Sequence, residues 1–502
     1  MAETLASVSL PPVRYAFARQ AGIAFIPGET PRYVVRSGAD RRRLLEVYRV
    51  VGGNYPVSEM GTVEYDQLLR DLYAYAGLDE TELEETTRGE SLSDLIDQIP
   101  QSEDLLDDSS SAPVIRLING LIAEAVRMQA SDVHVESFSD RVVIRYRIDG
   151  VMKEAASVSA KLSKLLVSRI KVMARLDIAE KRLPQDGRLS LSLGSKLVDI
   201  RVSTLPSRNG ERVVLRLLDN SDARFRLEDL GMSAEVLAAY ERALAQPNGV
   251  VLVTGPTGAG KTTTLYSGLN RLNTLARNIL TVEDPIEYAV DGIGQTQVNA
   301  KIGMTFAGGL RAILRQDPDI VMVGEIRDAE TAEVAVQASL TGHLVLSTVH
   351  TNSAVAAIAR LRDMGAESYL LASTLTAIIA QRLVRKLCHA CREPYEPDAA
   401  ERDILGLGEA EDAILYRPTG CPDCKSLGYT GRVGIYEIVE VDEVLRKLIH
   451  EDARESEMAA HAFARSQTLF ENGARLAMSG ETSLAEVLRL CRDDGGVRHA
   501  GV

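Results

Sequence analysis

The sequence lacks an apolar run long enough to cross a bilayer, which requires about 18 to 20 residues. The longest uncharged, apolar-leaning stretch runs from Ser368 to Gln381, contains serine and threonine, and is too short. The amino terminus, Met-Ala-Glu-Thr, also lacks the basic and apolar segments of a secretory signal. We therefore expect a cytoplasmic protein that reaches a membrane only through a partner.

Basic side chains are fewer than acidic ones. The 502 residues include 57 Lys and Arg against 71 Asp and Glu, which gives a formal net charge of −14. Such a balance repels a polyanion, so a nucleic-acid ligand is disfavoured.

Acidic residues concentrate ahead of residue 110. Twelve Asp and Glu stand against one Arg between Asp79 and Asp108, so this stretch contributes −11 of the total charge. Residues 101–112 include three successive serines and cannot bury enough apolar surface to fold. We predict an acidic flexible linker at 101–112; for the acidic run as a whole, a solvated face without a partner is the alternative.

Cysteine is rare, with five in the whole chain. Four of them form two C-x-x-C pairs, Cys388 with Cys391 and Cys421 with Cys424. In a reducing cytoplasm such pairs bind metal in preference to forming disulfides. Four thiolates suit tetrahedral Zn²⁺, and a closed Cys₄ site is structural because no open coordination position remains. We predict a zinc site there, with His389 as a less favoured alternative ligand, and we expect Cys491 to be inert.

The length exceeds what one hydrophobic core supports, so we expect several domains. Helix-like and strand-like patterns alternate, which indicates a mixed α/β protein. After Pro113, apolar residues at helical spacing are followed by alternating strand patterns, which predicts a small α+β domain. The predicted division is 1–100 as an N-terminal domain, 101–112 as the linker, 113–220 as the α+β domain, 233–385 as a nucleotide domain, 386–427 as a cysteine lobe and 428–502 as a C-terminal helical lobe.

The most informative stretch is an apolar run, Val250 to Val253, which is followed by a glycine-rich loop. The loop residues are Gly255, Pro256, Thr257, Gly258, Ala259, Gly260, Lys261 and Thr262. The glycines allow a tight turn whose N–H groups point at phosphate oxygens, and the following helix presents its positive amino terminus. Lys261 is placed to reach the β- and γ-phosphates, and the Thr262 hydroxyl to bind Mg²⁺. We predict a nucleoside triphosphate site.

Two apolar strands beyond the loop end in carboxylates. Ile279 to Glu283 ends in Glu283 itself, and Ile320 to Val323 is followed by Glu325. Carboxylates at strand ends beside a phosphate loop suit Mg²⁺ or the attacking water. We assign Glu325 to a Walker B strand. We favour Glu325 over Glu283 as the group that acts on the attacking water, and Glu283 stays the alternative.

A third apolar strand, Leu344 to Thr348, is bracketed by His343 and His350. Either imidazole is a candidate for sensing the γ-phosphate, with plain packing as the alternative. Arg311 and Arg315 lie four residues apart and so share a helix face. They are candidates for phosphate contact, with a solvated basic face as the alternative.

The α+β domain carries more arginine than solubility requires. Arg201, Arg212 and Arg216 lie on its predicted strands, and Arg188 and Arg208 lie in its loops. Arginine is the residue that reaches a γ-phosphate from a neighbouring subunit. The domain is therefore a candidate source of trans-acting arginines.

Together these residues give the chain a resemblance to the secretion ATPase superfamily, and within it to the E-proteins of type II secretion, the general secretion pathway. The matching segments are Ala130-Ser-Asp-Val-His-Val-Glu136, Arg147-Ile-Asp-Gly150, Arg182 to Arg188, the phosphate loop, Val282 to Glu287, Leu314 to Asp328 and Thr341 to Asn352. They extend over about 113 to 440, whereas the first hundred residues match only loosely.

The resemblance implies a multidomain α/β protein in which a RecA-like P-loop ATPase domain follows a PAS-like α+β domain and carries a Cys₄ zinc insertion. It implies ATP, Mg²⁺ and Zn²⁺ as cofactors, and hydrolysis between the subunits of a homohexamer. Glu325 would belong to an atypical Walker B box and His350 to a His box. Arg201 and Arg216 would approach the nucleotide from the preceding domain.

The resemblance also implies a role. The N-terminal domain would bind the cytoplasmic domain of an inner-membrane secretion protein, which would hold the ring on the cytoplasmic face of that membrane. The ring would hydrolyse ATP to drive pseudopilus assembly and protein export. Type IV pilus extension is the main alternative, because the Cys₄ insertion occurs in secretion and extension members and is missing from retraction motors. The acidic balance disfavours a DNA-linked motor, and the intact loop disfavours an inactive scaffold.

Overall fold

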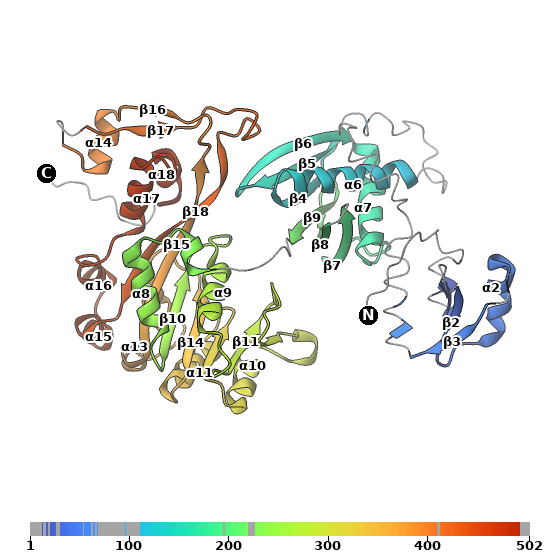
Figure 1. Ribbon diagram of the computed structural model, residues 1–502, viewed down its shortest axis with the longest axis horizontal. Helices are drawn as coiled ribbons and strands as arrows, with labels where there is room; N and C mark the ends of the chain where they lie inside the picture. Colours follow the sequence, from blue (N-terminus) through green and yellow to red (C-terminus); the bar gives the residue numbers. More distant parts are fainter. Residues whose placement is uncertain are drawn as a thin grey trace. The chain divides into compact units, whose positions relative to one another are not determined.

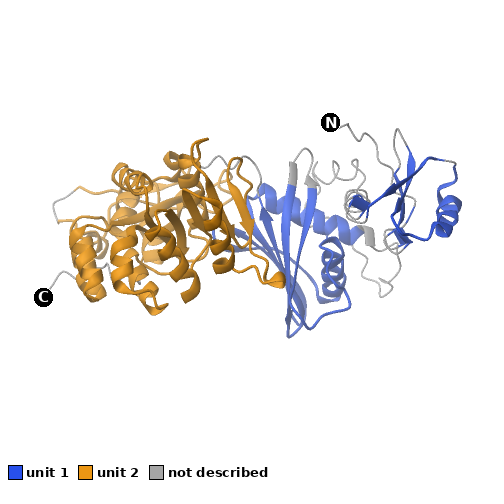
Figure 2. Ribbon diagram, turned by 90° about the horizontal axis from the view of Figure 1, so that it is seen from below, with its two compact units in different colours: residues 1–219 blue, residues 220–502 orange. Residues whose placement is uncertain are grey.

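The computed structural model describes residues 111–193, 196–218, 226–408 and 412–491, and in the amino-terminal part 13, 17–18, 21–26, 31–53, 55–61, 64–65, 68 and 96. The chain divides into two compact units, Met1–Asp219 and Asn220–Val502 (Figure 2). Residues 101–110 of the predicted linker lie outside the described residues. Ser111, at its end, already begins a helix.

A small three-stranded sheet lies near the amino terminus. Its elements are β1 (Ile23–Ile26), β2 (Arg32–Arg36), η1 (Arg41–Arg43), α2 (Leu44–Val51) and β3 (Val57–Met60). Strand β2 is central, antiparallel to β1 and parallel to β3. Its three central residues are all buried, and Val34 packs in a core with Ile23 of β1 and Val47 of α2.

The described residues from 111 to 218 contain an antiparallel six-stranded sheet with the order β6-β5-β4-β9-β8-β7. Its elements are α6 (Ser111–Arg127), β4 (Ala130–Ser137), β5 (Arg141–Ile148), β6 (Val151–Ser159), η3 (Ala160–Leu162), α7 (Ser163–Met173), β7 (Gln185–Leu193), β8 (Lys196–Ser207) and β9 (Gly210–Leu218). Helix α6 buries Leu117, Leu121 and Ala125 at the spacing of one helix face. The predicted helix and strands of this region are therefore present.

The second unit is built on a seven-stranded sheet with the order β12-β11-β13-β14-β10-β15-β18 (Figure 1). Its strands are β10 (Gly249–Thr254), β11 (Ile279–Glu283), β12 (Gly294–Gln297), β13 (Ile320–Val323), β14 (Leu344–Val349), β15 (Leu375–Leu387) and β18 (Tyr429–Glu440). All neighbouring strands are parallel except β18, which pairs antiparallel with β15. Helix α8 (Ala234–Leu244) precedes the first of these strands, and the helices between the strands are α9 (Lys261–Leu272), α10 (Phe306–Ile313), α11 (Ala329–Leu340), α12 (Ala354–Asp363) and α13 (Ser368–Thr374).

Strands β10, β13 and β14 are buried along their whole length. Continuous apolar strands of this kind are typical of a parallel sheet covered by helices on both faces. Val251 and Val253 of β10 pack in the core that contains α8 and α9, whereas Val250 and Leu252 pack in the core that contains α10 to α13. The sheet therefore holds the end of β10 between two rigid layers.

Residues 429–440, which were expected at the start of the C-terminal lobe, form β18 and extend the main sheet instead. The residues from Gly434 to Val439 are continuously buried, because they pair with β15 inside the sheet. The segment between β15 and β18 holds the cysteine pairs together with β16 (Glu393–Tyr395), α14 (Ala399–Leu405) and β17 (Leu415–Arg417). Four helices complete the unit: α15 (Glu443–His450), α16 (Glu455–Ala462), α17 (Leu469–Met478) and α18 (Leu484–Cys491). None of the helices within the described ranges is long and apolar enough to span a bilayer.

Candidate functional site

The glycine-rich loop connects β10 to α9 and depends on glycine for its shape. Gly255, Gly258 and Gly260 all have positive φ, at 149°, 80° and 85°. A Cβ atom on Gly255 would lie 2.6 Å from the backbone oxygen of Gln381, and one on Gly260 would lie 3.0 Å from the Gln381 side-chain nitrogen. Both the backbone conformation and the close approach of β15 therefore require glycine at these two positions.

Lys261 is the first residue of α9, and its side chain turns back into the loop. Its Nζ donates hydrogen bonds to the backbone oxygens of Gly255 (2.8 Å) and Pro256 (3.2 Å) and lies 3.4 Å from Nδ1 of His350. Burial lowers the pKa of Lys261 to about 8; Glu325 opposes this shift and Arg382 adds to it. The next residue, Thr262, is exposed at the helix amino terminus.

Glu325 follows β13, the neighbour of β14, and lies beside His350. Its Oε2 is 3.3 Å from Nε2 of His350, and its Oε1 is 2.5 Å from Nη2 of Arg327. Since β13, β14 and β10 are adjacent and parallel, their carboxyl ends bring Glu325, His350 and Lys261 together. An acid, an imidazole and an ammonium thus lie in one continuous row beside the loop.

Glu283 has a different environment, although it also ends a strand. It is 3% exposed and accepts hydrogen bonds from the Tyr266 hydroxyl (2.5 Å), the Thr281 hydroxyl (2.6 Å) and the Gln295 amide (3.0 Å). Burial, together with the hydrogen bond to Glu283, raises the pKa of Tyr266 above its ordinary value. Three donors already hydrogen-bond to the Glu283 carboxylate, which favours Glu325 over Glu283 as the group that orients the attacking water.

The two candidate histidines lie at opposite ends of β14. His343 precedes the strand, where its Nδ1 is 2.8 Å from the backbone oxygen of Ala338. His350 follows the strand on the side of the loop. Arg311 of α10 forms a 2.5 Å ion pair with Glu330. Arg315 lies beyond the end of α10, in the 3-10 helix Leu314–Gln316, and donates to the Arg311 backbone oxygen at 2.7 Å.

Arg201 and Arg216 belong to the first unit. They are direct partners across β8 and β9 and lie in one row of the sheet, which reads Arg147, Asp132, Arg216, Arg201, Arg188 from β5 to β7. Nε of Arg216 donates to Oδ1 of Asp132 at 3.0 Å. Within its own unit the row forms a positively charged stripe; its approach to the loop of the second unit stays a prediction.

The four cysteines predicted to bind metal come together. Their sulfur atoms all lie within 4.8 Å of one another, with separations of 3.8 Å for Cys388 to Cys421, 3.8 Å for Cys391 to Cys424 and 3.7 Å for Cys421 to Cys424. A tetrahedral zinc ion with bonds of about 2.3 Å places its sulfur ligands about 3.8 Å apart. The thiols therefore fit the metal closely. His389 is exposed and outside this group, and Cys491 is buried in the core.

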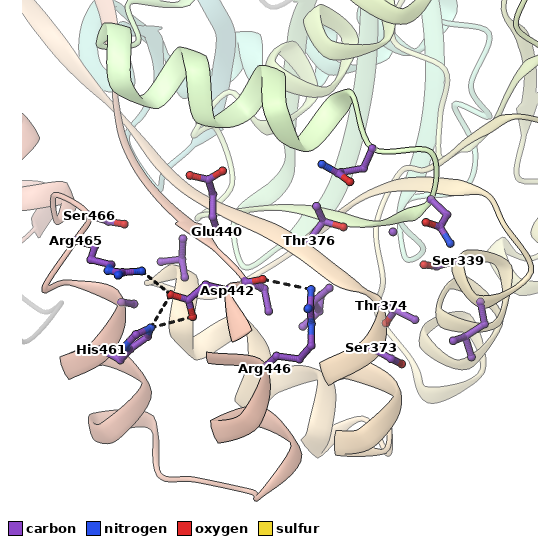
Figure 3. A pocket seen from close by; sticks show the side chains of 18 residues that line it. Ser339, Ser373, Thr374, Thr376, Glu440, Asp442, Arg446, His461, Arg465 and Ser466 are labelled. Atoms are coloured by element: carbon purple, nitrogen blue, oxygen red, sulfur yellow. Dashed lines mark hydrogen bonds and ion pairs between the residues drawn. The ribbon is translucent and has the colours of Figure 1, made fainter. Parts of the chain in front are cut away.

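A polar cavity of about 640 Å³ lies at the other end of the sheet, where Gly249 begins β10 and Leu375 begins β15 (Figure 3). Asp442 is at its centre. It accepts from Nε2 of His461 at 2.9 Å, from Nη1 of Arg465 at 3.0 Å and from the backbone amide of Leu445 at 2.8 Å. Although burial alone would raise it, the pKa of Asp442 is lowered by these partners. The network fastens α15 to the end of α16 and is separate from the phosphate loop.

The model of the family described as "Type II/IV secretion system protein" matches residues 107–489, about three quarters of the chain. The chain belongs to this family. The resemblance noted in the sequence is confirmed, and with it the mixed α/β fold and the ATPase activity.

Relatives of this secretion ATPase are similar over nearly their full length. The "Type II secretion system protein E" of Pseudomonas aeruginosa is 52% identical over 494 residues, which cover 98% of both chains. The "Type II secretion system ATPase E" of Vibrio cholerae is 52% identical over 452 residues, or 90% of both chains. The solved structure of the Legionella pneumophila ATPase DotB has a TM-score of 0.55 at 20% identity and covers 78% of this chain and 98% of its own, a likeness of fold alone.

Several residues of the secretion ATPase site were not found from the sequence. Tyr266 and Gln295 hold Glu283, and Gln381 and Arg382 of β15 contact the loop and the segment after β14. Gln381 and Arg382 lie about 120 residues after the loop, in an otherwise apolar strand. The only sequence signal for their role is that they are polar residues within a buried strand. Arg327, in contrast, lies two residues from Glu325, within the segment Leu314 to Asp328 that carries the resemblance.

Proposed function

We propose that this secretion ATPase hydrolyses ATP at the loop of residues 255–262, and that Glu325 orients the attacking water. The proposal rests chiefly on one observation, the convergence of Lys261, His350 and Glu325 at the carboxyl ends of three adjacent strands. Ligands of open α/β sheets bind at this edge. Positioning and charge stabilisation supply most of the catalysis in phosphoryl transfer.

Each group has a role that follows from its chemistry. The loop amides and the Lys261 ammonium bind the phosphates, and the Thr262 hydroxyl is the group that would hold Mg²⁺, which neutralises phosphate charge when bound. Glu325 accepts a hydrogen bond from the attacking water, and His350 links that carboxylate to Lys261. Arg201 and Arg216 are proposed to stabilise the γ-phosphate from the preceding domain or from a neighbouring subunit.

We further propose that the cysteine cluster holds a structural zinc ion, because four thiolates at tetrahedral spacing leave no open position. The segment between β15 and β18 has little regular structure of its own, so the ion would stabilise it. The ion takes no part in hydrolysis in this proposal.

The biological role is proposed from the relatives. These relatives are named for the type II secretion system. Their names favour a role in pseudopilus assembly and protein export over a role in type IV pilus extension. We propose a homohexamer on the cytoplasmic face of the inner membrane, held there when the N-terminal domain binds the cytoplasmic domain of an inner-membrane secretion protein. The division of the chain into six parts stays a prediction.

Replacement of Lys261 by Ala tests the nucleotide site. We expect Lys261→Ala to lose ATP turnover by at least about a hundredfold, because it removes a charge that contacts the transferred phosphate. Circular dichroism and thermal unfolding report whether the variant folds, and Lys447→Ala, which removes a lysine from an exposed ion pair with Glu451, is the matched control. Near-normal turnover by a folded Lys261→Ala protein would contradict the proposal.

A further inference from the structure

Strand β15 lies beside β10 in the sheet and carries a buried amide that contacts the phosphate loop. Gln381 is 1% exposed. Its Nε2 donates to the backbone oxygen of Ala259 at 2.5 Å, and its Oε1 accepts from the hydroxyl of Thr264 in α9 at 2.7 Å. The amide thus connects the loop and the first turn of the helix to a neighbouring strand.

The hydrogen bond to Ala259 has a consequence for the loop. The carbonyl of Ala259 and the N–H of Gly260 belong to one peptide unit, which is planar and trans, so the two groups point in opposite directions. When the carbonyl is held against Gln381, the Gly260 N–H is directed away from β15. A bound phosphate needs its N–H donors directed into the loop in advance.

Glutamine suits this position for a chemical reason. A side-chain amide donates from its nitrogen and accepts at its oxygen, so it bonds the Ala259 carbonyl and the Thr264 hydroxyl at once, and a protonated carboxylic acid of the same length offers the same pair of groups. Thr264, which is fully buried, fixes the orientation of the amide by donating to its oxygen. The next residue, Arg382, donates to the backbone oxygen of Asn352 at 2.7 Å, two residues beyond His350. Two adjacent residues of β15 therefore hold both the loop and the histidine segment.

We propose that Gln381 is a positioning residue for nucleotide binding, which directs the Gly260 N–H towards the phosphates. The inference rests on the proposed function, since it assumes that the loop binds phosphate. Gln381 contacts no substrate itself and acts only through the peptide unit of Ala259 and Gly260.

Gln381→Met tests the inference, because methionine matches the length of glutamine and forms neither hydrogen bond. We expect the Kd for a fluorescent ATP analogue and the KM for ATP to rise about tenfold, with kcat changed less than about threefold, since the loop binds phosphate before and during the reaction. Thr482→Val is the matched control. Thr482 is also fully buried and donates to β15 at the Arg385 backbone oxygen (2.8 Å), so its loss should lower the melting temperature without changing the KM.

Gln381→Glu gives a second, independent readout. A buried glutamate has a raised pKa, and in its neutral form it keeps both a donor and an acceptor. Relative to wild type, the affinity of Gln381→Glu should therefore recover as the pH falls from 8 to 6, whereas that of Gln381→Met should not. The pH dependence of Gln381→Glu still tests the inference if Gln381→Met fails to fold.

The outcomes separate the inference from the proposed function. If Lys261→Ala abolishes binding while folded Gln381→Met binds within twofold of wild type, the role of Gln381 is wrong and the site is right. If Gln381→Met fails to fold and Gln381→Glu shows no recovery at pH 6, the positioning role is likewise overturned. If Lys261→Ala binds ATP normally, the proposed nucleotide site itself is wrong.

Discussion

Raising the pH from 7 to 9 should weaken nucleotide binding, because it discharges Lys261. Burial lowers the pKa of this residue to about 8. A group with that pKa is roughly nine-tenths charged at pH 7 and roughly one-tenth charged at pH 9. Phosphates favour the ammonium form, so binding takes up a proton above pH 8, and the affinity should fall about tenfold over this interval.

The assay is fluorescence polarisation of a non-hydrolysable fluorescent ATP analogue with Mg²⁺ at constant ionic strength. The interval lies above the ordinary pKa of histidine and above the second ionisation of a phosphate, so neither group contributes much. Lys261→Arg is the control, because a guanidinium stays charged throughout. Its affinity, whatever the value at pH 7, should stay level. An equal decline in both proteins would refute the assignment to Lys261.

Two further predictions concern the second unit away from the loop. Glu486, whose side chain is 1% exposed, accepts hydrogen bonds from Arg385 and Arg489. Burial alone would raise the pKa of Glu486, but the two arginines lower it to about 2. Glu486→Gln should lower the free energy of unfolding at pH 7 by about 2 kcal/mol, a value discounted because Arg489 is half exposed. A lowered pKa stabilises the fold above the unfolded-state pKa, so the difference from wild type in urea unfolding should shrink as the pH falls from about 4.5 towards 2; a constant difference would contradict this. Cys421→Ser should lower the zinc bound per chain, measured by elemental mass spectrometry, whereas Cys491→Ser should not; unchanged zinc in Cys421→Ser would exclude the cysteine cluster.

The sequence was sufficient where function depends on neighbouring residues. The loop from Gly255 to Thr262 is one local motif, and its strand and helix follow from the apolar pattern on either side. The cysteine pairs were also predictable, because two C-x-x-C pairs have few other uses in a reducing compartment.

The sequence was insufficient where side chains meet through the sheet. Glu283 and Glu325 both end apolar strands, and only the positions of Tyr266 and Gln295 distinguish them. His343 and His350 bracket the same strand, and the parallel direction of that strand decides which one reaches the loop. Sequence spacing carries none of this information, since the strand order differs from the chain order.

The place of β18 was also hidden in the sequence. Its residues follow the cysteine segment and precede four helices, so a pattern read along the chain assigns them to the C-terminal lobe. Their pairing with β15 from Ala377 to Leu387 is a long-range contact that no local pattern reports.

Glu325, and not Glu283, is proposed to act on the attacking water. The most direct test measures ATP binding and ATP turnover for Glu325→Gln and Glu283→Gln in the full chain. We expect Glu325→Gln to bind ATP within about threefold of wild type and to lose turnover by at least about a hundredfold, whereas Glu283→Gln should keep turnover within about tenfold and melt at a lower temperature. Normal turnover in Glu325→Gln, with turnover abolished in a folded Glu283→Gln protein, would contradict it.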